Sequence, residues 1–235
     1  MIKKMILFTA LAASATLFAA PAPILDYDFT APVIVKGGRF KQPTFLRPVK
    51  IASPQTAIVL DGRNELTIPD SSALSLANGG TLHCVVNFKD NPATKEALFR
   101  NLDMVFFKPG DFLFGRMSNK IYFNIGDGQP NKTQWKMTTY VEDCPLKTWV
   151  ALTAVLTKKA EKLYNVVIYQ DGKQVFNKDF RTAFAAPSKE PVTLGKGWGG
   201  PWCLDGMIAK VMIFDKPLTA AEVAALTAAE PYIKK

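Results

Sequence analysis

The sequence predicts an all-β protein: an antiparallel β-sandwich with one short helix near its carboxyl end. Short apolar runs with a period of two recur along the chain, and turn residues such as Asp-Gly and Gly-Gly separate them. One segment near the carboxyl end carries the signals of a helix start. Strands at this density without helices between them are typical of an antiparallel sandwich or jelly roll.

The composition is that of a packed globular protein. Hydrophobic residues make up 48% of the 235 residues and charged residues 21%, so the chain is too apolar for general disorder. Its three cysteines and one histidine exclude a disulfide-rich miniprotein, a Cys/His zinc module and most histidine-dependent catalysis. The net charge of +9 is spread over the chain, with local clusters only at 158–162 and 234–235, so we expect no nucleic-acid partner.

The amino end has the layout of a secretory signal peptide. A basic start at Lys3 and Lys4 precedes an uncharged run over 5–20, which is shorter than the roughly 20 residues of a spanning helix. We expect a signal peptide over 1–22, cleaved between Ala15 and Ala22, and no membrane span after it. The protein is then exported, as a secreted, periplasmic or cell-surface protein, and residues 23–235 form a single domain without a linker.

The strands are predicted one after another through that domain. In chain order they are 24–29, 57–60, 65–68, 81–88, 104–107, 112–117, 121–125, 135–140, 149–156, 163–170, 174–180, 192–194 and 207–214. The proline-bearing stretch 31–54 is the least regular and is either a long loop or a set of poorly paired strands. In 81–88, alternation places Leu82 and Cys84 on the apolar face and His83 on the opposite face.

Turn and cap residues support these boundaries. Asp171-Gly172 lies between two strand-like runs, and Asp-Gly is a preferred two-residue hairpin turn because both positions need positive φ. Thr219-Ala220-Ala221-Glu222 is a capping box, so the helix begins at Thr219 and continues to about Ala229.

Export would permit disulfide bonds. Cys84, on an apolar strand face, is expected to be a buried thiol. Cys144 and Cys203 lie in loop-like contexts and are the candidate pair if any pair forms, although sequence alone does not fix connectivity.

In order, four stretches resemble the laminin G-like jelly roll of the concanavalin A-like lectin/glucanase superfamily. They are 60–82 with its Asp61-Gly62 turn, 149–152 beginning at Trp149, the hairpin 167–173, and the closing segment 194–223. The resemblance covers roughly 26–226 and implies this fold, with Trp149 in the core. It implies a fold and not an activity.

The same resemblance raises the question of calcium. Related jelly rolls often carry an acidic pair where this chain has Ala209 and Lys210, and the corresponding acid helps to hold a structural calcium ion. We therefore expect no cofactor, with calcium as the disfavoured alternative. Its weak candidate ligands are Asp26, Asp28, Asp205 and Asp215.

The catalytic patterns of related enzymes are absent from the sequence. Glucanases of this superfamily carry Glu-x-Asp-x-Glu on a strand, which points several carboxylates into one cleft, and no glutamate here has an aspartate two residues on. Jelly-roll lyases use tyrosine and histidine, but His83 on a sheet face is more typical of a surface or packing residue. His83 and Cys84 are neighbours on a strand, so they point to opposite faces and cannot form a dyad.

The best recognition element in the sequence is a glycine-rich connection with two tryptophans. Trp198 and Trp202 stand in 195–202, and Trp135 is a third candidate between polar residues. An aromatic face in such a loop can stack on a sugar ring, although tryptophans can equally cover the ends of a sandwich. The favoured interpretation is an exported, non-catalytic module that binds carbohydrate or a cell-surface glycan or protein. The alternatives are a hydrolase or lyase with an unrecognised active site, and a structural envelope protein without a small ligand.

Overall fold

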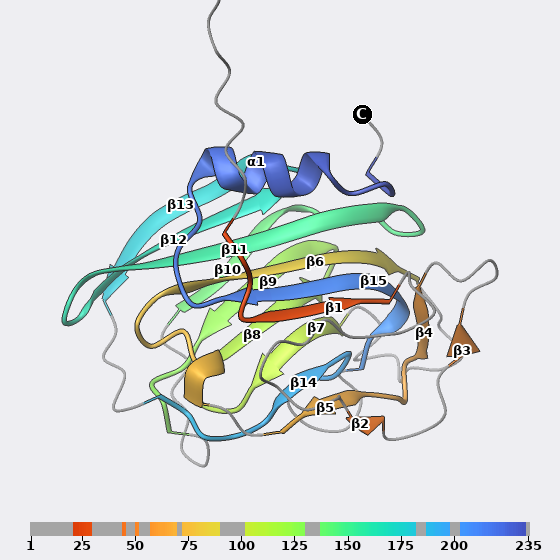
Figure 1. Cartoon of the computed structure of the whole chain (residues 1–235), viewed down its shortest axis with the longest axis horizontal. Helices are drawn as coiled ribbons and strands as arrows, with labels where there is room; N and C mark the ends of the chain where they lie inside the picture. Colours follow the sequence, from red (N-terminus) through yellow and green to blue (C-terminus); the bar gives the residue numbers. More distant parts are fainter. Residues whose placement is uncertain are drawn as a thin grey trace, which may run out of the picture.

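The chain folds into two antiparallel sheets packed face to face, as the sequence predicts (Figure 1). The computed structural model describes residues 21–29, 44–45, 50–51, 57–69, 72–89, 102–129, 137–181, 187–197 and 203–233. The expected signal peptide falls almost entirely outside those residues.

The first sheet, called sheet A, has eight strands among the described residues. Seven of them follow the order β13-β12-β11-β6-β15-β4-β3, and β1 also pairs with β15. The bounds are β1 Leu25–Asp28, β3 Lys50–Ile51, β4 Ile58–Asp61, β6 Gly80–Phe88, β11 Trp149–Ala160, β12 Leu163–Gln170, β13 Lys173–Arg181 and β15 Asp205–Phe214.

The second sheet, called sheet B, has seven strands among the described residues, in the order β10-β9-β8-β7-β14-β5-β2. The bounds are β2 Thr44–Phe45, β5 Leu66–Ile68, β7 Leu102–Lys108, β8 Phe112–Met117, β9 Lys120–Ile125, β10 Met137–Asp143 and β14 Val192–Leu194. The irregular stretch 31–54 thus contributes two paired strands of two residues each, and an unpredicted short 3-10 helix forms at Ser72–Leu74.

The core lies between the sheets and is built by the predicted alternation. The apolar faces of β6, β11 and β12 all enter it, and their residues are essentially inaccessible to solvent. From these three strands the core takes Leu82, Cys84, Val86, Phe88, Val150, Leu152, Ala154, Leu156, Tyr164, Val166 and Ile168. Period-two alternation therefore identified the buried face of these strands correctly.

The α-helix seen in the described part of the chain, α1 (Ala220–Ala228), packs on the outer face of sheet A. The predicted capping box is formed: the Thr219 side chain accepts from the Glu222 N–H, and the Glu222 carboxylate accepts from the Thr219 N–H. Val223 and Leu226 of the helix pack with Tyr169 of sheet A. The helix therefore removes part of the outer face from water. No helix in the described part of the chain is both long and apolar enough to cross a membrane.

The carboxyl-terminal residues continue this cover, which corrects the expectation that Trp149 lies in the core. His83 does lie on the face opposite the core, but it is 0% exposed. Trp149 is only half-buried, and its ring lies 4.8 Å from the ring of Tyr232 on the outer face, so it is not a core residue. The outer face of sheet A is thus a second, smaller packed layer under α1 and the residues that follow it.

Candidate functional site

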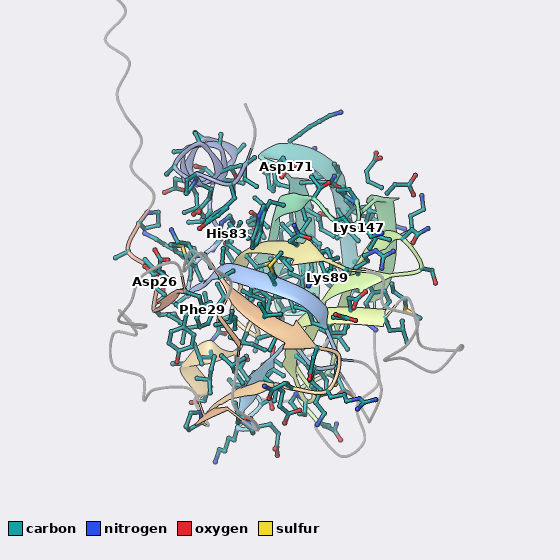
Figure 2. The ribbon with its side chains drawn as sticks, turned by 90° about the vertical axis from the view of Figure 1, so that its right-hand side faces the viewer. Asp26, Phe29, His83, Lys89, Lys147 and Asp171 are labelled. Atoms are coloured by element: carbon teal, nitrogen blue, oxygen red, sulfur yellow. The ribbon has the colours of Figure 1, made fainter. Side chains whose placement is uncertain are left out.

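The candidate site lies at the end of the sandwich where β6 and β12 end and where β11 and β15 begin. The strand pairings fix this placement, since Trp149 is opposite Asn87, Leu152 is opposite Gln170 and Gly206 is opposite Phe88. The Lys147 N–H also donates to the Phe88 carbonyl at 2.7 Å. Figure 2 looks onto this end, with Lys89, Lys147 and Asp171 labelled.

A buried ion pair ties the two sheets together at this end. Arg116 of β8 donates from Nη1 to Asp103 Oδ2 of β7 at 3.1 Å, and both side chains are 0% exposed. The other Asp103 oxygen accepts from the Asp205 N–H of sheet A at 3.1 Å. Through Asp103, the pair thus links the start of β15 to sheet B.

The β12–β13 turn adopts the conformation that its sequence predicts. Asp171 and Gly172 both have positive φ, 51° and 78°. The Asp171 Oδ1 atom accepts from the Ala151 N–H at 2.8 Å, and the Asp171 N–H donates to the Ala151 carbonyl at 2.8 Å. The turn is therefore held against β11 and does not project freely.

Across from this turn, β10 ends in an irregularity. The register of β10 against β9 shifts between Val141 and Asp143, and the bulged residue Glu142 has a φ of 41°. A left-handed conformation is uncommon for a residue with a side chain, so local pairing must hold it. Asp143 pairs with Lys120 of β9, with 2.8 Å between Asp143 Oδ1 and Lys120 Nζ. The bulge aims Glu142 and Asp143 in different directions.

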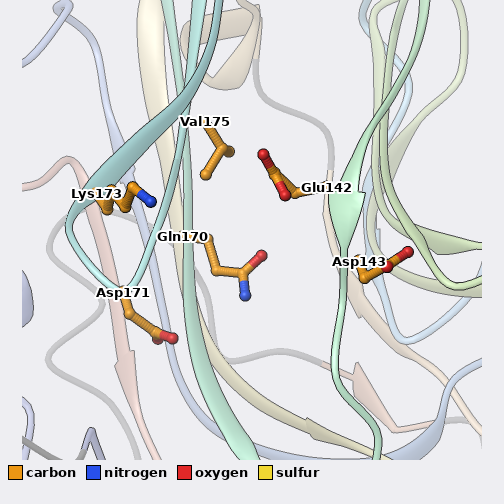
Figure 3. A pocket seen from close by; sticks show the side chains of 6 residues that line it. All are labelled: Glu142, Asp143, Gln170, Asp171, Lys173 and Val175. Atoms are coloured by element: carbon orange, nitrogen blue, oxygen red, sulfur yellow. The ribbon is translucent and has the colours of Figure 1, made fainter.

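Between these two segments lies a pocket of about 260 Å³. It is lined by Glu142, Asp143, Gln170, Asp171, Lys173 and Val175. Figure 3 shows Glu142 directed toward Gln170 and Val175, whereas Asp143 is directed away from them. The pocket thus lies between β10, at the edge of sheet B, and the β12–β13 hairpin, at the edge of sheet A.

The pocket chemistry is dominated by hydrogen-bond acceptors. Partial desolvation raises the pKa of the Asp171 carboxyl, and the hydrogen bond from the Ala151 N–H opposes that shift. The Gln170 Oε1 atom is shielded from solvent and accepts no hydrogen bond from the described residues. Lys173 contributes the one ammonium group among the lining residues, and Val175 contributes an apolar surface.

The three tryptophans predicted to bind ligand, Trp198, Trp202 and Trp135, lie outside the described residues. The ends of the 198–202 connection are described, because Lys196 and Cys203 form an isolated antiparallel bridge. The Leu204 N–H also donates to the Gly195 carbonyl at 2.8 Å. This connection therefore leaves and re-enters the fold at adjacent points on the same end as the pocket.

The candidate disulfide between Cys144 and Cys203 is not formed in the structure. Cys84, Cys144 and Cys203 are all buried, and no disulfide joins any two of them. Burial raises the pKa of the Cys84 thiol, and Cys144, which lies in the same core cluster, raises it further.

The four weak candidates for metal ligands are not brought together. Asp26 and Asp28 lie on β1 opposite Met212 and Lys210, whereas Asp205 and Asp215 lie at the two ends of β15. Within the described ranges, no three His, Cys, Asp or Glu side chains are grouped to hold a metal. The Lys210 ammonium lies 3.8 Å from Asp28 Oδ2 and 3.1 Å from Glu230 Oε1.

The Lys210 ammonium thus already lies beside the carboxylates of Asp28 and Glu230, where a metal ion would otherwise be attracted. This arrangement leads to a prediction for metal removal. Chelation by excess EDTA should leave the melting temperature of the protein nearly unchanged, as measured by calorimetry. A fall of roughly 5 °C or more, which corresponds to about 1–2.5 kcal/mol for a domain of this size, would reveal a structural ion and contradict the prediction.

Comparison with known protein families identifies the family of this chain. Residues 60–224 match the family described as the concanavalin A-like lectin/glucanases superfamily. The chain belongs to that superfamily. The resemblance seen in the sequence motifs is thereby confirmed, and so is the sandwich that it implied.

Solved structures of this fold include binding domains. One of them is domain 4 of AbnA, a GH43 extracellular arabinanase from Geobacillus stearothermophilus, which was solved in complex with arabinotriose. It is 17% identical to this chain with a TM-score of 0.59, and the match covers 88% of this chain and 99% of that domain. The receptor-binding domain of botulinum neurotoxin type G is 12% identical, with a TM-score of 0.63, over 88% of this chain. The chain spans about half of that domain, 51% of its length. A search of the curated proteins gave no match. At such identities, the likeness to this superfamily's solved members shows the fold alone.

Proposed function

We propose that this concanavalin A-like chain is an exported, non-catalytic module that binds carbohydrate in the pocket between β10 and the β12–β13 hairpin. The observation that carries the proposal is the lining of that pocket: carboxylate, amide and ammonium groups around one apolar side chain. Its fold neighbours, one of them bound to arabinotriose, support a binding role.

The pocket matches the chemistry of a sugar ring. Sugar hydroxyls both donate and accept, and Asp, Glu, Gln and Lys side chains offer both kinds of partner. Val175 can cover a C–H face of the ring, and its strand neighbour Lys173 provides a donor at the rim. Small-ligand pockets combine a few such polar groups with apolar surface in the same way.

The arrangement does not support glycoside hydrolysis. That reaction needs two carboxyl groups facing each other across the scissile bond. Glu142 and Asp143 diverge at the bulge, Asp143 is paired with Lys120, and one Asp171 oxygen is committed to the β11 backbone (Figure 3). Binding without bond cleavage is therefore the function that the geometry favours.

The proposal is tested by binding and turnover measured together. A glycan array probed with the mature protein should show retained glycans, while a reducing-sugar assay on the same glycans stays at background. Gln170→Ala should weaken binding by roughly two- to tenfold, because it removes a hydrogen-bonding amide worth about 0.5–1.5 kcal/mol.

Gln174→Ala is the matched control, because Gln174 lies on the same hairpin, is exposed and does not line the pocket. It should bind like the wild type. Release of reducing sugar would support the hydrolase alternative, and equal losses in the two variants would place binding elsewhere. The connection with Trp198 and Trp202, whose base lies on the same end of the sandwich, is the second place where a sugar could be held.

A further inference from the structure

The charge of the pocket differs in sign from the charge of the chain. The whole sequence carries a net charge of +9, which would favour anionic polymers. The pocket lining instead has three carboxylates and one ammonium group. Lys120 neutralises Asp143 at 2.8 Å, which leaves Glu142 and Asp171 against Lys173.

The pocket lining also offers more hydrogen-bond acceptors than donors. Among the described residues, the Glu142 carboxylate accepts no hydrogen bond, and the Gln170 Oε1 atom is shielded from solvent without a donor. Asp171 has one oxygen bonded to the Ala151 N–H and a second that no described residue fills. A ligand that fills this pocket must therefore bring donors, and an anionic group would meet like charge.

We infer that the pocket selects glycans that carry a free, protonated amino group over neutral glycans, and that it rejects uronate-bearing glycans. This inference rests on the proposed carbohydrate-binding function. A primary ammonium group supplies three donors and a positive charge, which matches the carboxylates of Glu142 and Asp171 in the pocket lining. A uronate carboxylate would supply acceptors and a negative charge, and it would leave those acceptors unfilled.

The expected preference is moderate, because Glu142 is exposed at the rim. Exposed charge pairs contribute little each, so two carboxylates should give roughly a two- to thirtyfold tighter dissociation constant for the amino-bearing glycan. The preference should shrink as salt is added, since exposed charges are screened.

The experiment compares oligosaccharides that differ in one group. Cellotetraose, its 2-amino counterpart and its 6-carboxyl counterpart share one backbone and linkage, and further matched sets on an array cover other backbones. Calorimetry at pH 6 and low salt is then carried out on the set of glycans that binds on the array. The amino-bearing glycan should bind most tightly, the neutral glycan less tightly and the uronate-bearing glycan most weakly. Glu142→Gln, which removes the charge but keeps the shape, should move the amino-to-neutral ratio toward one.

Glu161→Gln is the charge-matched control. Glu161 is exposed in the β11–β12 turn, at the opposite end of the hairpin from the pocket, so its loss should leave the preference intact. Equal affinity for the three sugars, tighter binding of the uronate, or an unchanged ratio in Glu142→Gln would overturn charge selection while carbohydrate binding stands. A protein that retains no glycan from any set would overturn the proposed function and this inference together.

Discussion

Acidification from pH 6.5 to pH 3 should remove about 3–5 kcal/mol of stability from the wild type relative to a His83→Gln variant. His83 is fully buried, with its Nδ1 atom 2.9 Å from Thr153 Oγ1. Burial, together with the nearby Lys210 ammonium, lowers its pKa from 6.5 to about 3. Below pH 6.5 the unfolded chain takes up a proton that the folded chain refuses, so folding becomes less favourable as the pH falls.

The magnitude follows from the size of the shift, at 1.36 kcal/mol per pKa unit. Glu230 Oε1 lies 4.0 Å from His83 Nε2, but Lys210 also pairs with that carboxylate. Asp111 acts in the opposite direction, because burial raises its pKa from 3.8 to about 6 and its folded form takes up a proton first. The test therefore measures the free energy of unfolding in denaturant as a function of pH for the wild type and for His83→Gln, and compares the two. Parallel pH profiles would contradict the prediction.

The second large effect concerns the buried ion pair between Arg116 and Asp103. Arg116→Met should cost about 3–5 kcal/mol in free energy of unfolding, because it removes the guanidinium that pairs with the buried Asp103 carboxylate. The double variant Arg116→Met/Asp103→Asn should be more stable than Arg116→Met alone. The asparagine removes the stranded charge while its carbonyl oxygen can still accept from the Asp205 N–H.

Urea melts of the single and double variants measure this directly. A cost below about 1 kcal/mol for Arg116→Met would mean that water or another group compensates Asp103. A double variant that is no better than the single one would mean that the cost comes from lost packing and not from charge.

The fold was predictable because its signals are local. Period-two alternation identified the core face of β6, β11 and β12, the Asp171-Gly172 turn placed a hairpin, and the capping box placed α1. Each of these signals needs only neighbouring residues. The burial of His83 could not be read in this way, since alternation assigns a residue to a face but does not say that α1 and the residues after it cover that face.

The pocket was missed for a related reason. Glu142 and Gln170 are distant in sequence, and they face each other only because β10 and the β12–β13 hairpin are edge elements of different sheets. Nothing in the sequence marks Glu142 as a bulge, because a glutamate rarely adopts positive φ. Asp103 and Arg116 did leave a signal: charged residues at inward positions of apolar strands, which usually indicates a buried pair.

A titration of isotope-labelled mature protein with a bound oligosaccharide, followed by backbone amide chemical shifts, tests the central claim most directly. If the pocket binds carbohydrate, the largest shifts should fall on Glu142, Asp143 and residues 170–175, and they should saturate with the calorimetric dissociation constant. If those amides stay in place while shifts gather at 195–203, the sugar is held by the tryptophan connection and the assignment of the pocket is wrong.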